Sequence, residues 1–153
     1  MKELSYEQAL SRAASLCSTS EHCTGEMEEK LRKWGLENNE IERALEYLVD
    51  EKYIDNLRFS RAYCLDKLRY NHWGRIKIQQ MLHHLGLSSQ EIQEGLSAIE
   101  EEEYESILLD VANVRLRTLH DEDAFTRQGK LIRHLLSKGF EMDFIMKHLP
   151  SVL

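Results

Sequence analysis

The stretch LRKWGLENNEI, residues 31–41, recurs twice further along the chain, as LHHLGLSSQEI (82–92) and LLSKGFEMDFI (135–145). Each copy places one glycine between two amphipathic segments, and the glycines are 51 and 53 residues apart. Apolar residues stand eight and four positions before each glycine, and one, six and ten positions after it. This agreement in position and residue type indicates a threefold internal repeat of about 50 residues.

Each copy is predicted to be a helical hairpin that turns at its glycine. A spacing of four residues places the apolar side chains before the glycine on one helical face. A glycine can adopt the left-handed backbone that ends a helix, and the apolar residue after it then contacts the leucine four positions before it. In the middle copy, Ser88 and Glu91 form the pattern of a capping box for the next helix. Leu31 and Trp34 are expected to pack in the core of the first copy.

A further amphipathic segment precedes each hairpin, at residues 5–18, 56–69 and 104–117, which gives three helices per repeat. One such repeat is too small to bury its apolar faces alone. The sequence therefore predicts an all-α fold of three tandem three-helix, helix-turn-helix-like repeats stacked into an elongated, curved array. The expected domains are residues 1–54, 55–103 and 104–153, and the helices on either side of residues 100–104 are weakly separated.

Composition supports a helical protein of the cytoplasm. The 153 residues include one proline and seven glycines, which leaves little material for a turn-rich β fold. No apolar run approaches the roughly 20 residues of a membrane span, and the N-terminus lacks the apolar core of a signal peptide. Three cysteines without CxxC spacing favour a reduced compartment over a disulfide framework.

The charge is unevenly distributed. The whole chain has a formal net charge of -7, but residues 52–84, here called the basic segment, carry seven cations against Asp55 and Asp66. Cations beside aromatic side chains are suited to an acidic protein surface or to phosphates. The predicted partner-binding residues are therefore Arg61, Lys67, Arg69, Tyr70, Trp73, Arg75 and Lys77. The alternative is that these cations only solvate helix faces.

Several side chains of the basic segment have a more specific prediction. Asp55 is placed to cap the helix that starts near Asn56, and Arg58 is expected to pair with it. Phe59 and Tyr63 occupy apolar-face positions and are expected in the core. Trp73 is expected to be exposed, because a glycine turn is a poor place to bury an indole.

The sequence offers no catalytic or metal centre. His83 and His84 are adjacent and point about 100° apart on a helix, and the other histidines show no i, i+4 pairing. No GxSxG, phosphate-binding glycine loop or catalytic cysteine motif is present. We therefore expect a protein that is not an enzyme and that binds no cofactor or metal.

The basic segment also resembles a known family. EKYIDNLRFSRAY (51–63) and WGRIKIQQMLHHLGL (73–87) resemble the second repeat of the RecX family, the regulators of the bacterial recombinase RecA. The resemblance covers residues 6–100 well, and the last third agrees in its repeat pattern. The chain departs from the family's glycine-aromatic-glycine-proline turn, which reads His72-Trp73-Gly74-Arg75 here, and has Met81 where an acidic residue is common.

The resemblance implies a non-enzymatic modulator. Proteins of this family bind in the helical groove of the RecA filament on single-stranded DNA, where they limit filament growth, ATP hydrolysis and strand exchange. For this chain it implies the RecA filament as partner, with the single-stranded DNA in that complex as a second candidate. Apart from the resemblance, we expect a monomer that attaches to no membrane.

Two other functions fit the hairpin pattern. A helix-turn-helix DNA reader inserts the second hairpin helix into the groove and needs cations there. The second hairpin helices expected at residues 37–48, 88–99 and 141–149 are acidic or nearly neutral, which argues against groove insertion. The second alternative is a general α-helical scaffold that binds another acidic protein. Only the family resemblance favours a RecA modulator over such a scaffold.

Overall fold

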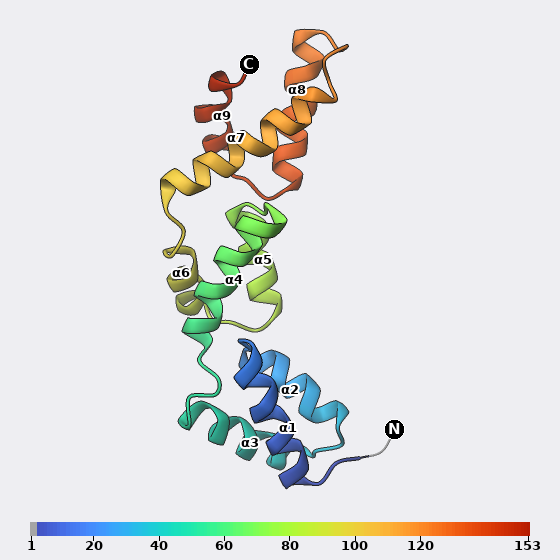
Figure 1. The fold of residues 1–153 in the computed structure, drawn as a ribbon, viewed down its shortest axis with the longest axis vertical. Coiled ribbons are helices and arrows are strands. Elements are labelled where there is room, and N and C mark those ends of the chain that lie inside the picture. The colour runs from blue at the N-terminus through green and yellow to red at the C-terminus, as the bar shows by residue number, and fades with distance from the viewer. Residues whose placement is uncertain (1–2) are drawn as a thin grey trace. The chain divides into compact units, whose positions relative to one another are not determined.

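A computed structural model describes residues 3–153, which form nine α-helices, one short 3-10 helix and no strand (Figure 1). The all-α prediction is confirmed. No helix within residues 3–153 is both long and apolar enough to cross a bilayer. The helices are α1 (Tyr6–Thr19), α2 (Thr24–Lys33), α3 (Asn38–Asp50), α4 (Asn56–Asn71), α5 (Arg75–His84), α6 (Ser89–Leu96), α7 (Glu101–Arg117), α8 (Ala124–Ser137) and α9 (Met142–His148), followed by η1 (Leu149–Ser151).

The chain divides into two compact units. The first unit contains the residues up to Ala62 together with Leu82–Gly95, and the second contains Tyr63–Met81 with Leu96–Leu153. Helices α1, α2 and α3 pack against one another in the first unit, and α7, α8 and α9 do so in the second. The helices of the middle repeat contribute residues to both units. Helix α6 ends at Leu96 and α7 begins at Glu101, so these two helices do not merge.

The three glycines make the same helix-ending turn. Gly35, Gly86 and Gly139 have φ values of 98°, 91° and 98°, in the left-handed region that favours glycine. In each copy the amide of the next residue donates to the carbonyl of the leucine four positions before the glycine, at 3.2 Å. These hydrogen bonds are Leu36 to Leu31, Leu87 to Leu82 and Phe140 to Leu135. The predicted glycine turns are therefore confirmed, each with the 6→1 bond of a Schellman motif.

The repeated apolar positions form the core. Leu45 and Leu96 are partly buried, and the other repeated positions are buried: Met27, Leu31, Leu36, Ile41, Ile78, Leu82, Leu87, Ile92, Leu131, Leu135, Phe140, Ile145 and Leu149. Trp34 packs against the core of α1–α3 as predicted. Phe59 is buried and Tyr63 is partly buried, so these two of the aromatic side chains of α4 also lie at the apolar face.

Two of the predicted helix caps are present. The Asp55 carboxylate accepts from the amides of Leu57 and Arg58 at 3.0 and 3.1 Å, and Ser88 and Glu91 form a reciprocal capping box. The predicted ion pair between Asp55 and Arg58 is wrong. The guanidinium of Arg58 instead binds Glu21, with Nε 2.5 Å from Oε2, because Glu21 reaches it from the loop before α2 while Asp55 is occupied by main-chain amides.

Candidate partner-binding site

The predicted partner-binding residues lie on α4, on the turn that follows it and on α5. Arg61 belongs to the first compact unit, and the other six belong to the second. Arg61 is paired with Glu94 of α6, with Nη2 3.3 Å from Oε1, and both side chains are about half exposed. Such an exposed pair adds little stability, but it partly neutralises the charge of Arg61.

Arg69 is held by a glutamate at the start of α7. Its Nε and Nη2 atoms lie 2.7 and 3.1 Å from the two carboxylate oxygens of Glu103. This bidentate hydrogen bonding raises the pKa of Arg69 and lowers the pKa of the Glu103 carboxyl. Glu103 belongs to the acidic run at residues 100–103, so part of that run supplies counterions to the basic segment.

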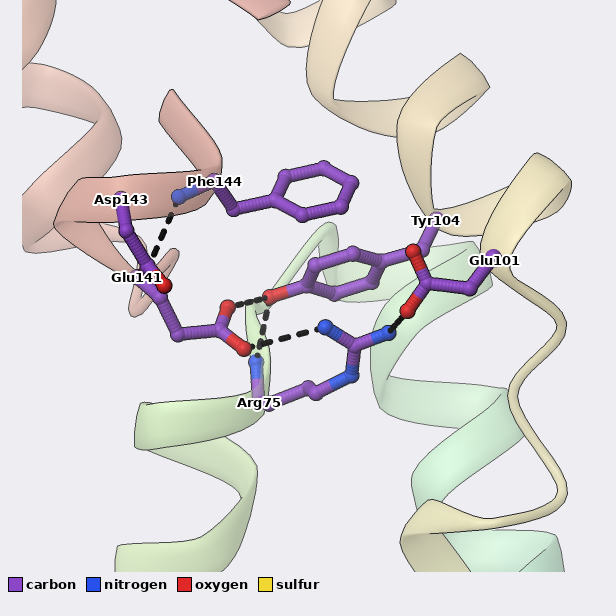
Figure 2. Close-up of polar contacts among 6 residues, drawn as sticks. All are labelled: Arg75, Glu101, Tyr104, Glu141, Asp143 and Phe144. Carbon is purple, nitrogen blue, oxygen red and sulfur yellow. Dashed lines mark hydrogen bonds and ion pairs between the residues drawn. The ribbon is translucent and has the colours of Figure 1, made fainter. Parts of the chain in front are cut away.

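Arg75 lies at the centre of a partly buried polar cluster (Figure 2). Its guanidinium is 3.8 Å from the ring centroid of Tyr104 and bonds Glu141 at 3.0 Å and Glu101 at 2.6 Å. The Tyr104 hydroxyl donates to Glu141 and accepts the Arg75 amide at 2.9 Å. Burial opposes the charge of Arg75, but the hydrogen bond and charge of Glu141 outweigh it and raise the pKa. Arg75 therefore joins α5 to α7 and to the turn before α9.

Tyr104 is the most buried member of this cluster, and burial together with its bond to Glu141 raises the pKa of its hydroxyl. We expect Tyr104→Phe to lower the free energy of unfolding by about 1–3 kcal/mol, because the Arg75 amide and Glu141 each lose a buried partner. Chemical denaturation measures this change. Tyr70→Phe is the matched control, since Tyr70 is 80% exposed, and its stability is expected to stay unchanged. Equal stability of Tyr104→Phe and the parent chain would contradict the role given to the hydroxyl.

Of the cations predicted to bind a partner, Lys67 and Lys77 are the two without a counterion within residues 3–153, and both lie near Trp73. The Nζ atoms of Lys67 and Lys77 lie 5.1 and 4.8 Å from the ring of Trp73, and Lys67 also lies 5.3 Å from the ring of Tyr63. Within residues 3–153 neither ammonium group has a carboxylate at ion-pairing distance. Lys67, Trp73 and Lys77 are called the lysine–tryptophan cluster below.

The expectation that Trp73 is exposed is wrong. Its indole is partly buried, and the ammonium groups of Lys67 and Lys77 lie near its ring from α4 and α5. A cation is attracted to the face of an aromatic ring, which favours this arrangement over a freely exposed indole. Tyr70 is the exposed aromatic side chain of the predicted set.

The turn that carries Trp73 is tightly bonded. His72 has a φ of 57°, a conformation that is costly for a residue with a Cβ atom. The amide of Trp73 donates to the carbonyl of Lys67 at 3.1 Å, which reverses the chain after α4. The next residues then start α5, whose first amide, that of Arg75, is satisfied by the Tyr104 hydroxyl.

The glycine turn of the third repeat holds the start of α5, the helix that carries Lys77. The amide of Gly74 donates to the Lys138 carbonyl at 2.8 Å, and that of Ile76 donates to the Gly139 carbonyl at 2.9 Å. A Cβ atom on Gly74 would lie 2.4 Å from the backbone of Gly139, so only glycine permits this approach. Main-chain bonds thus position the start of α5, and with it Lys77.

The seven predicted residues therefore separate into two groups. Arg61, Arg69 and Arg75 are paired with glutamates, whereas Lys67, Tyr70, Trp73 and Lys77 have no carboxylate bound within the described chain. Residues 3–153 contain no group of three or more His, Cys, Asp or Glu placed to hold a metal ion. A cationic and aromatic surface of this kind can bind an anionic partner.

The three glycine turns and the lysine–tryptophan cluster define the class of protein. It is an all-α protein of three three-helix domains, with cationic side chains on the middle domain. Family models described as the first, second and third three-helix domains of RecX match residues 9–48, 55–96 and 101–149. The chain belongs to the RecX family.

Similar proteins agree with this assignment. The regulatory protein RecX of Clostridium tetani is 30% identical over 127 residues, which cover 82% of this chain and 58% of that protein. The chain thus spans less than two thirds of the length of the clostridial relatives. The regulatory protein RecX of Chlorobaculum tepidum is 29% identical over 153 residues, covering all of this chain and 93% of that protein. The crystal structure of RecX from Lactobacillus salivarius has the same fold, with a TM-score of 0.86 over 96% of each chain at 18% identity.

Proposed function

We propose that this chain is a non-enzymatic modulator that inhibits the RecA recombinase. It binds in the groove of the RecA filament on single-stranded DNA and limits filament growth, ATP hydrolysis and strand exchange. It acts in the cytoplasm as a monomer and without a cofactor. The observation that carries the proposal is an unpaired lysine–tryptophan cluster in the middle domain of a RecX-family chain.

The chemistry of the cluster suits such a partner. An ammonium group without a counterion gains most when it meets an acidic side chain or a phosphate, and exposed aromatic rings are common anchors in interfaces. The paired arginines would first have to release their glutamates. Lys67 and Lys77 therefore form the main contact, and Tyr70 and Trp73 provide the aromatic surface beside it.

The helix-turn-helix alternative is disfavoured by the helices that would enter a groove. Helix α6 carries Glu91 and Glu94 and no lysine or arginine, and α3 carries one arginine among several acidic residues. Groove insertion brings a recognition helix between rows of phosphates, which repel such a surface. The cations lie on α4 and α5 instead.

The direct test follows ATP hydrolysis by RecA on single-stranded DNA. Adding this chain in excess is expected to slow ATP hydrolysis progressively. The bound chain stops filament growth, so RecA that dissociates is not replaced and the amount of hydrolysing filament falls. Bovine serum albumin at the same concentration controls for nonspecific effects. Unchanged hydrolysis at saturating concentrations of the chain would contradict the proposal. Binding to bare DNA is not decisive, since any cationic surface gives weak, salt-sensitive binding.

A further inference from the structure

The second compact unit contains a cavity of about 320 Å³. It lies between α7, the last turns of α8 and the turn after α4. Its lining comprises His72, Asp110, Val111, Val114, Arg115, Thr118, His134 and Lys138. The proposed filament contact uses none of these residues.

Within residues 3–153, no carboxylate lies at ion-pairing distance from Arg115 or Lys138 of this cavity. Nη1 of Arg115 donates to Thr118 Oγ1 at 3.2 Å, and its buried Nε has no partner within residues 3–153. Lys138 donates to the main-chain carbonyl of Asn71 at 2.9 Å. Burial and the charges of Arg115 and Lys138 together lower the pKa of His134. The cavity therefore holds a surplus of positive charge.

Titratable groups face the cavity from each element around it. His72 comes from the turn after α4, Asp110 and Arg115 come from α7, and His134 and Lys138 come from the end of α8. Asp110 is the one carboxylate in the lining, and it is exposed. Neither Arg115 nor Lys138 lies within ion-pairing distance of it. One further negative charge would therefore be favoured here.

The same cavity has an apolar wall. Val111 is nearly buried, and Val114, one turn along α7 and next to Arg115, is 57% exposed. An exposed aliphatic side chain beside unpaired cations suits a ligand with an apolar part and an anionic part.

The helix ends nearby favour a carboxylate over a phosphate. Thr118 and Lys138, both in the lining, are the C-cap residues of α7 and α8, so two helices end at the cavity with their C-termini. Phosphates are usually bound where helix amides point at them, at N-termini, and the C-terminal end of a helix disfavours a dianion.

We propose that this cavity binds a carboxylate joined to a branched aliphatic group, as presented by the C-terminal leucine of a partner protein. The carboxylate lies against Lys138 and Arg115, and the aliphatic group lies on Val111 and Val114. The inference does not depend on the recombinase proposal, because the test uses this chain and small probes alone.

The test titrates the isotopically labelled chain with N-acetyl-leucine and, separately, with its uncharged amide, N-acetyl-leucinamide, while amide resonances are followed by NMR. We expect saturable shifts at Val114, Thr118 and Lys138 with the acid. The amide is expected to bind at least about tenfold more weakly, since it lacks the charge-assisted hydrogen bonds. Inorganic phosphate at equal concentration is expected to leave these resonances largely unmoved.

Variants locate the effect. Lys138→Gln is expected to weaken acid binding by about tenfold, and Val114→Asp, at an exposed position that folding tolerates, by at least as much. Arg133→Gln changes a cation of α8 outside the cavity and is expected to leave binding unchanged. Bound acid is also expected to raise the pKa of His134, measured from its ring resonances. Equal binding of acid and amide, tighter binding of phosphate, no saturable shift, or an unchanged affinity in Lys138→Gln would each overturn the proposal.

Discussion

Reversing both lysine charges of the cluster, in a Lys67→Glu, Lys77→Glu double variant, is expected to raise the concentration for half-inhibition of RecA by about a hundredfold. The two ammonium groups have no counterions within the described chain, so the double variant breaks no ion pair of the fold and loses only their contacts with the rings of Trp73 and Tyr63. Replacing them by carboxylates places like charges against an acidic surface or phosphates, which costs several kcal/mol. The readout is ATP hydrolysis by RecA on single-stranded DNA.

Two comparisons separate this effect from a general change in charge. Lys147→Glu alters an exposed lysine of α9 outside the cluster and is expected to inhibit like the parent chain. Arg69→Ala removes a cation that Glu103 already pairs, and a change of less than about threefold is expected. Circular dichroism and thermal unfolding verify that each variant is folded. Full inhibition by the folded double variant would mean that the cluster is only solvated surface.

The turns of the repeats could be predicted from the sequence because they are local. The glycine, the leucine four positions before it and the apolar residue after it lie within six residues, so their spacing alone specifies the turn. The same holds for the Asp55 cap and the Ser88–Glu91 capping box. Burial of the repeated apolar positions followed from the helical period.

Which cations of the basic segment are paired with glutamates could not be predicted in the same way. Arg69 and Glu103 are 34 residues apart, and Arg75 and Glu141 are 66 apart, so no spacing rule connects them. A charge count over residues 52–84 treats paired arginines and unpaired lysines alike. The acidic run at residues 100–103 is a sequence signal for counterions, but its position does not say which cations it meets.

How the chain accommodates its departures from the family pattern at the turn after α4 could not be predicted from the sequence either. His72 keeps a left-handed φ of 57° at a position where the resemblance implies glycine. Arg75 stands where it implies proline, a residue without an amide hydrogen, and the extra amide finds the Tyr104 hydroxyl at 2.9 Å. The turn is thus retained through long-range contacts that its own sequence does not reveal.

The glycine turn of the third repeat gives the largest expected effect on stability. In Gly139→Ala the new Cβ atom would lie 2.4 Å from Cβ and 2.7 Å from the amide nitrogen of Lys77, in addition to the unfavourable φ of 98°. The backbone of α5 has to move, and two main-chain bonds to this turn weaken with it. We expect the free energy of unfolding to fall by about 3–5 kcal/mol.

Gly86→Ala is the matched control, because Gly86 has nearly the same φ, 91°, but nothing within 4 Å of the added Cβ atom. Its expected cost is the conformational term alone, about 1–2 kcal/mol. Urea denaturation followed by circular dichroism, and by the fluorescence of the two tryptophans, compares the two variants. The difference between them measures the close approach of the third repeat's turn to α5. Equal destabilisation would show that backbone strain explains both, and that Gly139 does not hold Lys77 in place.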